Sequence, residues 1–186
     1  MKWLNIPAEE AAQRLLGCEL VSIIDDQEVR ARIVETEAYD QLDPASHSFS
    51  GRSARNDAMF KSAGHLYVYI SYGLHFCCNI VCGPVGCGSA VLIRAVEPLS
   101  GRAAIEARRG KKGVSTTNGP GKVCQALGIN LSLSGHDLSQ EPVQLIQKPS
   151  LKAEQIVTAT RIGISKNALA LRRFYEKNNS YVSKKA

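Results

Sequence analysis

The sequence lacks any long hydrophobic run. A membrane-spanning helix needs about 20 consecutive apolar residues, and no stretch of the 186 residues approaches that length. The first residues include Pro7, Glu9 and Glu10 in place of the apolar segment and small-residue cleavage site of a secretory signal peptide. We therefore expect an intracellular protein with no membrane partner.

The motifs of several common enzyme classes are also missing. Gly121 and Lys122 suggest a phosphate-binding loop, but Thr116 stands where its first glycine belongs and Val123 where its magnesium-binding Ser or Thr belongs. No two cysteines have the C-x-x-C spacing of a zinc site, so the signature of a zinc deaminase is absent too. Neither the Gly-x-Ser-x-Gly motif of esterases nor the Gly-x-Gly-x-x-Gly motif of dinucleotide-binding proteins occurs. We expect no metal site.

The composition is that of a globular protein, with 44% hydrophobic and 22% charged residues. The length suits a single domain over residues 1–186. A net charge of +6 favours a polyanionic partner such as nucleic acid without requiring one. Six cysteines could form three disulfides, but Cys77, Cys78, Cys82 and Cys87 crowd one strand-like segment of a chain without a secretory signal. Reduced, packed thiols are the prediction.

Hydrophobic periodicity and turn residues predict a mixture of helices and strands. The predicted helices cover 7–16, 102–109 and 120–127, and the predicted strands cover 18–24, 28–39, 65–72, 74–82, 89–96, 143–146, 161–164 and 171–175. Residues 40–64 form a long loop that contains a short helix near 57–61. A loop of this length usually has a function beyond connecting two strands. Residues 110–117 read as a linker. Tyr72, Gly73 and Leu74 form the tip of a hairpin, where a tyrosine and a leucine are unusual.

Charged residues occur inside two of these strands. By strand alternation, Glu35 and Glu37 point to the same face as Ile33, and Arg94 points to the same face as Val96. A guanidinium on an apolar face needs a partner, most simply one of the two glutamates. A structural ion pair, or glutamates that are solvated beyond the buried part of the strand, would explain the pattern equally well.

Aromatic residues gather in the same part of the sequence. Tyr39 follows Glu37, and Tyr67 and Tyr69 share one strand face. Simple sheet packing would account for such tyrosines. With the long loop that carries His47, the aromatic hairpin tip and the basic excess, however, they suggest a pocket for a planar group beside a polyanion.

Six blocks carry a resemblance to a known family. They are 35–39 (ETEAY), 64–73 (GHLYVYISYG), 76–80 (FCCNI), 91–99 (VLIRAVEPL), 119–127 (GPGKVCQAL) and 161–164 (RIGI). In this order they cover most of the chain, and together with His47 they resemble the alkyladenine (3-methyladenine) DNA glycosylase family. The resemblance implies an α+β fold: a single domain with a curved, largely antiparallel sheet, flanking helices and a protruding β-hairpin that inserts into DNA.

The resemblance also implies roles for individual residues. Glu37 matches the general base that activates a water for attack on the sugar C1′, and Arg94 matches the arginine that helps to hold that water. The carbonyl group of Ile162 would complete the water site. The residues that match the binding site of the flipped base are Tyr39, His47, Tyr69 and Asn79, with the main-chain N–H of His47 reading the purine 6-position and Asn79 excluding guanine. Tyr72 and Leu74 match the side chains that intercalate into DNA.

The implied partner is double-stranded DNA with alkylated or deaminated purines: 3-methyladenine, 7-methylguanine, hypoxanthine and ethenoadenine. The implied enzyme is a monomer without metal or organic cofactor that leaves an abasic site and does not cut the strand. Candidates for phosphate contacts are Arg52, Arg55, Arg108, Arg109, Lys111, Lys112 and Lys122. One alternative is a nucleic-acid-binding module of the same fold without catalysis. Another, an amidohydrolase or deaminase, would need a metal that the spacing does not supply.

Overall fold

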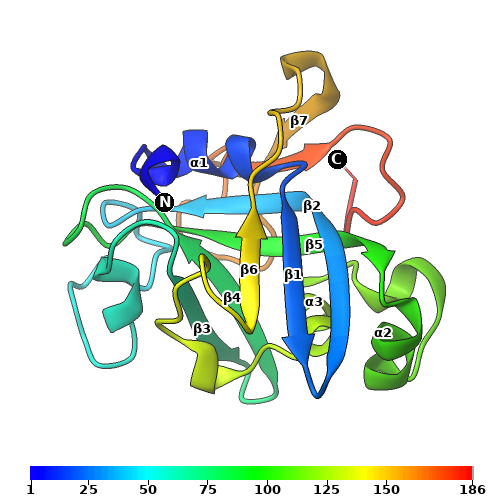
Figure 1. Cartoon of the computed structure of the whole chain (residues 1–186). Helices are drawn as coiled ribbons and strands as arrows, with labels where there is room; N and C mark the ends of the chain where they lie inside the picture. Colours follow the sequence, from blue (N-terminus) through cyan, green and yellow to red (C-terminus); the bar gives the residue numbers. More distant parts are fainter. Residues whose placement is uncertain (186) are drawn as a thin grey trace.

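The computed structural model describes residues 1–185 and is built around one curved sheet of eight strands (Figure 1). The strands are β1 (Glu19–Ile24), β2 (Gln27–Tyr39), β3 (Leu66–Ser71), β4 (His75–Val81), β5 (Ala90–Ser100), β6 (Val143–Ile146), β7 (Ile156–Ala159) and β8 (Arg173–Glu176). The sheet order is β3-β4-β5-β2-β1-β6, and β8 pairs with both β2 and β7. Every strand pairing in residues 1–185 is antiparallel. The predicted α+β fold is confirmed.

Within residues 1–185, three α-helices and five short 3-10 helices accompany the sheet. They are α1 (Ala8–Leu15), α2 (Arg102–Arg109) and α3 (Pro120–Leu127), with η1 (Lys2–Leu4), η2 (Asp57–Phe60), η3 (Gly113–Thr116), η4 (Leu131–Leu133) and η5 (Ala153–Gln155). α1 lies along β2 (Figure 1). None of the helices in residues 1–185 is long and apolar enough to span a membrane.

One large hydrophobic core fills one face of the sheet. Leu15 of α1, Ile33 of β2, Ile93 of β5 and Leu127 of α3 are fully buried in it. Burying a side chain of this size contributes about 1.5–3 kcal/mol to stability. Thr36 also faces this side, because its hydroxyl donates to the carbonyl of Ala12 in α1 at 2.9 Å. The core and α1 therefore fix β2 on one face of the sheet. The opposite face is available for a site.

Two irregularities in the β2–β5 pairing decide which side chains reach that opposite face. Ile33 pairs with Val96 and Glu35 with Ala95, so that Val34 is an extra residue in β2. Thr36 then pairs with Ile93, so that Arg94 is an extra residue in β5. Such bulges shift the alternation of side chains. The prediction from simple alternation, which placed the two glutamates with Ile33 and Arg94 with Val96, is wrong, because Ile33 and Val96 face the core while Glu37 and Arg94 face a pocket.

The strand predicted over 161–164 is also wrong. Residues 161–164 are irregular, with a bend at Ile162 and Gly163 and a φ of +75° at Gly163. The strand of this region is β7, which the pattern did not reveal. The reason is tertiary: the Ile162 N–H donates to the Glu37 carboxylate at 2.8 Å, so it is not available for a strand pairing. The 110–117 segment, read as a linker, contains η3, and its Thr117 carbonyl accepts from the Val96 N–H at 3.3 Å.

The cysteines agree with the prediction of reduced thiols. All six are free, and five of them are buried while Cys87 is exposed. Burial raises the pKa of Cys82 to about 12, so this thiol stays protonated at neutral pH. Within residues 1–185, no three His, Cys, Asp or Glu side chains come together as a candidate metal site.

Candidate active site

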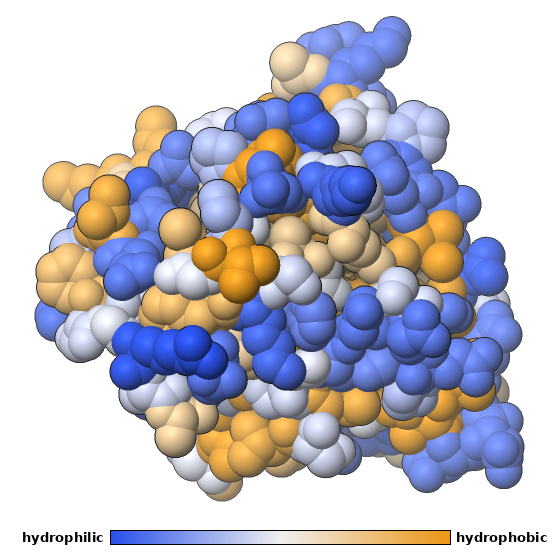
Figure 2. Space-filling view, turned by 60° about the vertical axis from the view of Figure 1, so that its left-hand side comes forward, coloured by the Kyte–Doolittle hydropathy of each residue, from blue (hydrophilic) through white to orange (hydrophobic). Residues whose placement is uncertain are grey.

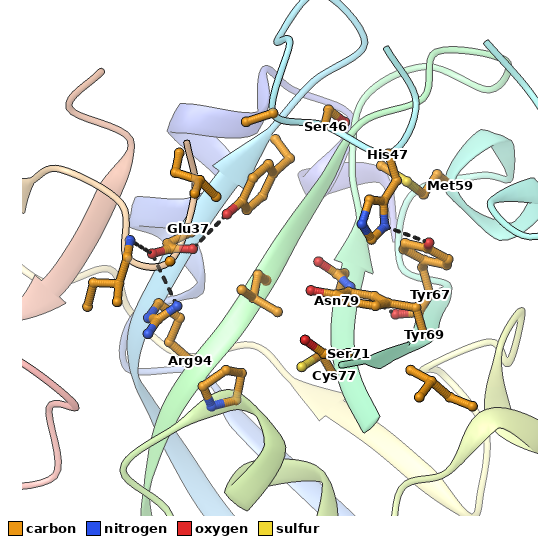
Figure 3. Close-up of a pocket in the computed structure, with 18 of the residues that line it drawn as sticks. Glu37, Ser46, His47, Met59, Tyr67, Tyr69, Ser71, Cys77, Asn79 and Arg94 are labelled. Carbon is orange, nitrogen blue, oxygen red and sulfur yellow. Dashed lines mark hydrogen bonds and ion pairs between the residues drawn. The ribbon is translucent and has the colours of Figure 1, made fainter. Parts of the chain in front are cut away.

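A pocket of about 420 Å³ opens on the sheet face opposite the main core. Its walls come from β2, β3, β4 and β5 and from two loops, residues 45–47 and 162–164, and Arg55, Met59, Tyr72 and Pro120 complete them. Figure 3 shows Glu37 and Arg94 on one side of this pocket, and His47, Tyr67 and Tyr69 on the other. The surface of the molecule seen in Figure 2 is mostly hydrophilic, with separate hydrophobic patches.

Every residue that the sequence predicted for base binding or catalysis lines the pocket.

Glu37 is the acidic residue of the pocket, and its side chain is fully buried. One carboxylate oxygen accepts from the Tyr39 hydroxyl at 2.8 Å, and the other accepts from the Ile162 N–H at 2.8 Å. Arg94 lies 3.3 Å from that second oxygen (Figure 3). Three groups from three segments hold this carboxylate in one orientation. A general base needs such a fixed orientation. Glu35 is equally buried but does not line the pocket.

The opposite wall is aromatic. The rings of Tyr67 and Tyr69 stack with centroids 5.7 Å apart, and the His47 ring meets Tyr69 edge-on at 4.5 Å. A hydrogen bond of 2.9 Å joins His47 Nδ1 to the Tyr67 hydroxyl. Burial raises the pKa of Tyr67 to about 12. Burial and the nearby charge of Arg55 lower the pKa of His47. The wall is therefore neutral at physiological pH and suits a flat aromatic ligand.

Tyr39 is held in place by a buried ion pair that sequence reasoning did not identify. The guanidinium of Arg161 lies 4.6 Å from the centre of the Tyr39 ring and binds the carboxylate of Asp43 through two nitrogens. Burial alone would raise the pKa of Asp43, but hydrogen bonds from Arg161, the Ala45 N–H and Asn167 lower it. The only sequence signal was indirect, since Arg161 lies in a recognised block and Asp43 in the long loop.

Asn79 projects into the pocket from β4. Its side-chain nitrogen donates to the Tyr67 carbonyl at 3.1 Å, and the residue is only 5% exposed. It shares its strand face with Cys77, which also lines the pocket, as alternation predicts. The hydrogen bond fixes the amide group, so a ligand meets a rigid polar edge at this position.

The β3–β4 hairpin ends in the predicted tip. Leu74 donates its N–H to the Ser71 carbonyl at 3.1 Å, and Tyr72 has a φ of +51°. The side chains of Tyr72 and Leu74 are 87% and 80% exposed, and Tyr72 borders the pocket. A tyrosine in a left-handed conformation costs about 1–3 kcal/mol, and apolar exposure adds to that cost. The positive φ values of Tyr72 and Gly73 belong to the tight turn that the Leu74–Ser71 hydrogen bond closes. The exposure of Tyr72 and Leu74, in contrast, is not explained by the stability of the hairpin.

Two of the basic residues predicted to contact phosphates, Arg108 and Arg109, also make hydrogen bonds within the fold. Arg108 donates to the carbonyls of Ala126 and Ile24 at 3.2 and 2.8 Å, which supports the end of α3. Arg109 donates to the Thr116 carbonyl at 3.0 Å. Arg55 differs, because it borders the pocket and its guanidinium lies 6.0 Å from the Tyr69 ring centre.

Comparisons with known proteins find similar chains. A family model described as methylpurine-DNA glycosylase (MPG) matches residues 2–180. A protein of Carboxydothermus hydrogenoformans is 47% identical over 176 residues, which cover 94% of this chain and 92% of the relative. A protein of Methanoculleus marisnigri is 48% identical over 178 residues with the same coverage of both chains. A protein of Francisella tularensis subsp. tularensis is 42% identical over 186 residues, or 98% and 96% of the two chains.

All three relatives carry the name "Putative 3-methyladenine DNA glycosylase". The match of the family model extends over almost the whole chain, including every strand and every pocket residue. The identities exceed 40% over nearly complete chains on both sides. This chain therefore belongs to the methylpurine-DNA glycosylase family.

Proposed function

We propose that this protein is a DNA repair glycosylase that flips a damaged purine out of duplex DNA into the pocket and hydrolyses its N-glycosidic bond. The substrates proposed are the alkylated and deaminated purines: 3-methyladenine, 7-methylguanine, hypoxanthine and ethenoadenine. The products are a free base and an abasic site in an uncut strand. The observation that carries the proposal is the fully buried Glu37 carboxylate, held at the pocket wall opposite an aromatic surface.

The reaction needs a base and a water at the sugar. Glu37 takes a proton from the water, whose oxygen forms a bond to C1′ while the electron pair of the C1′–N9 bond leaves with the purine. The transition state resembles an oxocarbenium ion, which a nearby carboxylate stabilises. Arg94 and the Ile162 carbonyl would hold the water. The Ile162 N–H, in contrast, donates to Glu37 itself.

The pocket suits a flipped purine. Tyr39 and the pair formed by Tyr69 and His47 would cover the two faces of the base, replacing the stacking lost on leaving the duplex. The main-chain N–H of His47 would read the purine 6-position, and Asn79 would face the 2-position, where guanine alone carries an amino group. The loop around His47 is fixed, because the Asn56 side chain donates to the His47 carbonyl at 2.8 Å.

The hairpin supplies the wedge for base flipping. Side chains inserted between base steps unstack DNA at a cost of a few kcal/mol, which new contacts offset. Tyr72 and Leu74 would enter the gap that the flipped nucleotide leaves, and their exposure at the tip supports this role. The net charge of +6 favours approach to the phosphate backbone.

The test is base release by the purified protein. Duplexes with a single hypoxanthine or an alkylated adenine are incubated with protein and then treated with alkali, which cleaves only at abasic sites. Glu37→Gln keeps the shape but removes the base, and excision should fall by about 100-fold or more with lesion affinity retained. Excision within a few-fold of the parent would exclude Glu37 as the base, and binding without release by the parent would favour the non-catalytic module.

A further inference from the structure

A second buried carboxylate lies directly behind the pocket. Glu35 is fully buried and does not line the cavity. One of its oxygens accepts from Arg173 at 2.9 Å, and the other accepts from the Ser183 N–H at 2.7 Å. The oxygen that binds Arg173 also lies 3.5 Å from Arg94 Nε. The general base and this second carboxylate therefore share one arginine.

Arg94 is bound tightly by neither carboxylate. It lies 3.3 Å from Glu37 and 3.5 Å from Glu35, whereas charge-assisted N–H···O bonds are usually about 2.7–2.9 Å long. Its Nε atom is buried and has no hydrogen-bond partner in the described structure. Opposite attractions thus hold the guanidinium between the two acids.

The backbone is arranged to produce this position. Arg94 is the extra residue of the β5 bulge, and Val34, next to Glu35, is the extra residue of the β2 bulge. Without the two bulges, alternation would place Glu35, Glu37 and Arg94 on the core face with Ile33 and Val96. Bulges near active sites commonly re-aim a side chain in this way.

Glu35 itself is fixed from outside the pocket. Its partner Arg173 also donates to the carbonyls of Thr160 and Lys184, at 2.7 and 2.8 Å. Glu35 therefore connects the segment around Ser183 to Arg94, which lines the active site. The two glutamates and two arginines of this cluster balance in charge, which reduces the cost of burying them.

We propose that Glu35 is a positioning residue that keeps Arg94 at a distance from Glu37. This inference rests on the proposed function. With Glu35 in place, the guanidinium keeps a donor for the attacking water and leaves Glu37 able to take the proton of that water. Without it, Arg94 would close onto Glu37 in a tight two-bond pair. A carboxylate bound in that way is a poorer proton acceptor, and the water would lose its holder.

The chain offers a matched control for a purely structural ion pair. Arg32 of β2 binds Glu97 of β5 at 2.5 Å and Glu176 of β8 at 2.9 Å. This cluster joins the same three strands, but none of its members lines the pocket. Loss of Glu176 should therefore affect stability without affecting the chemistry.

The experiment compares Glu35→Gln with Glu176→Gln. Single-turnover excision of hypoxanthine, with protein in excess, gives the rate, and titration of a labelled lesion duplex gives the affinity. Glu35→Gln should lower the rate by about 10- to 100-fold, because displacement of a catalytic group by an ångström has effects of this size. Its affinity for the lesion duplex should change by less than about threefold, and Glu176→Gln should excise at about the parental rate.

A double variant separates positioning from general damage. Because Glu35 acts through Arg94, Glu35→Gln added to Arg94→Lys should slow excision by less than about twofold beyond Arg94→Lys alone. Equal multiplicative losses in both backgrounds would overturn the proposal. The proposal would also be overturned if the folded Glu35→Gln variant excised hypoxanthine at the parental rate while Glu37→Gln, prepared in the same way, was inactive. If the parent protein itself releases no base, the proposed glycosylase function is wrong. That result is distinct from failure of the Glu35 proposal, which requires an active parent.

Arg173→Lys provides a second arm if Glu35→Gln does not fold. It keeps both carboxylates and the buried positive charge, but a lysine cannot bind Glu35 and two carbonyls in the same geometry. We expect a loss of excision of about threefold to tenfold at unchanged lesion affinity. A folded Arg173→Lys protein with the parental rate would contradict the role of the cluster.

Discussion

Replacement of Arg161 by methionine should loosen the wall of the pocket that carries Tyr39. The Arg161 side chain is fully buried, binds Asp43 through two nitrogens, and donates to the Ala38 and Asn167 carbonyls at 3.1 and 3.4 Å. Methionine approximates the length of the side chain but provides none of these donors. Asp43, which is 2% exposed, would retain hydrogen bonds from the Ala45 N–H and the Asn167 side chain.

The structure sets the size of the effect. Breaking a buried ion pair from one side typically costs about 3–5 kcal/mol. The entropy of unfolding is about 2.1 cal/mol/K per residue, so the 186 residues give about 0.39 kcal/mol/K and a decrease in Tm of about 8–13 °C. In Arg161→Met the Asp43 carboxylate keeps only Arg172, at 3.4 Å, as a charged partner. The Arg161→Met, Asp43→Asn double variant removes this poorly neutralised charge and should recover part of the loss.

Thermal denaturation followed by circular dichroism measures both variants. Hydrogen bonds lower the pKa of Asp43 against the opposing effect of burial, so its stabilisation is present above its ordinary pKa of 3.8 and is lost as the pH falls through the lower folded value. The difference in Tm between parent and Arg161→Met should therefore be largest above about pH 4 and should shrink in acid. A decrease of less than about 2 °C at neutral pH would refute the reasoning.

Four further predictions concern the pocket and the DNA. Tyr72→Ala should weaken binding to lesion duplexes by about 1–3 kcal/mol, whereas Val85→Ala, at another exposed apolar residue, should not; equal affinities in a gel-shift titration would exclude the wedge. Asn79→Ala should release guanine from undamaged or mispaired duplexes, with a gain of roughly 10- to 200-fold, and retained hypoxanthine activity without this gain would exclude the gatekeeper role. The logarithm of DNA affinity should fall linearly with the logarithm of salt concentration, by about 0.9 per phosphate contact, and a salt-independent affinity would contradict a DNA-backbone partner. Because burial and Arg55 lower the pKa of His47, the folded state binds fewer protons than the unfolded state, so stability should fall as the pH drops below 6.5; denaturant titrations should show a smaller decrease for His47→Gln.

Local signals in the sequence determined several elements without help from the rest of the chain. α3 begins with proline at its first position and ends at Gly128, which has a φ of +70°. α1 follows from small and apolar residues on one stripe, Ala8, Ala11, Ala12 and Leu15, all of which are buried. The tip at Tyr72 and Gly73 was visible as a break between two strand patterns. These features depend on residues close in sequence, so a local pattern is sufficient to predict them.

Tertiary structure alone decided how the active site is assembled. Alternation could not show that bulges at Val34 and Arg94 would shift the register of two strands, because a bulge exists only relative to a partner strand. It could not show that Glu37, rather than Glu35, reaches the cavity. The irregular conformation of 161–164 likewise arises because its backbone and Arg161 bind residues more than 100 positions away. The sequence by itself thus determined which residues are available for the chemistry, while the long-range pairing of strands and buried charges determined where each of them points.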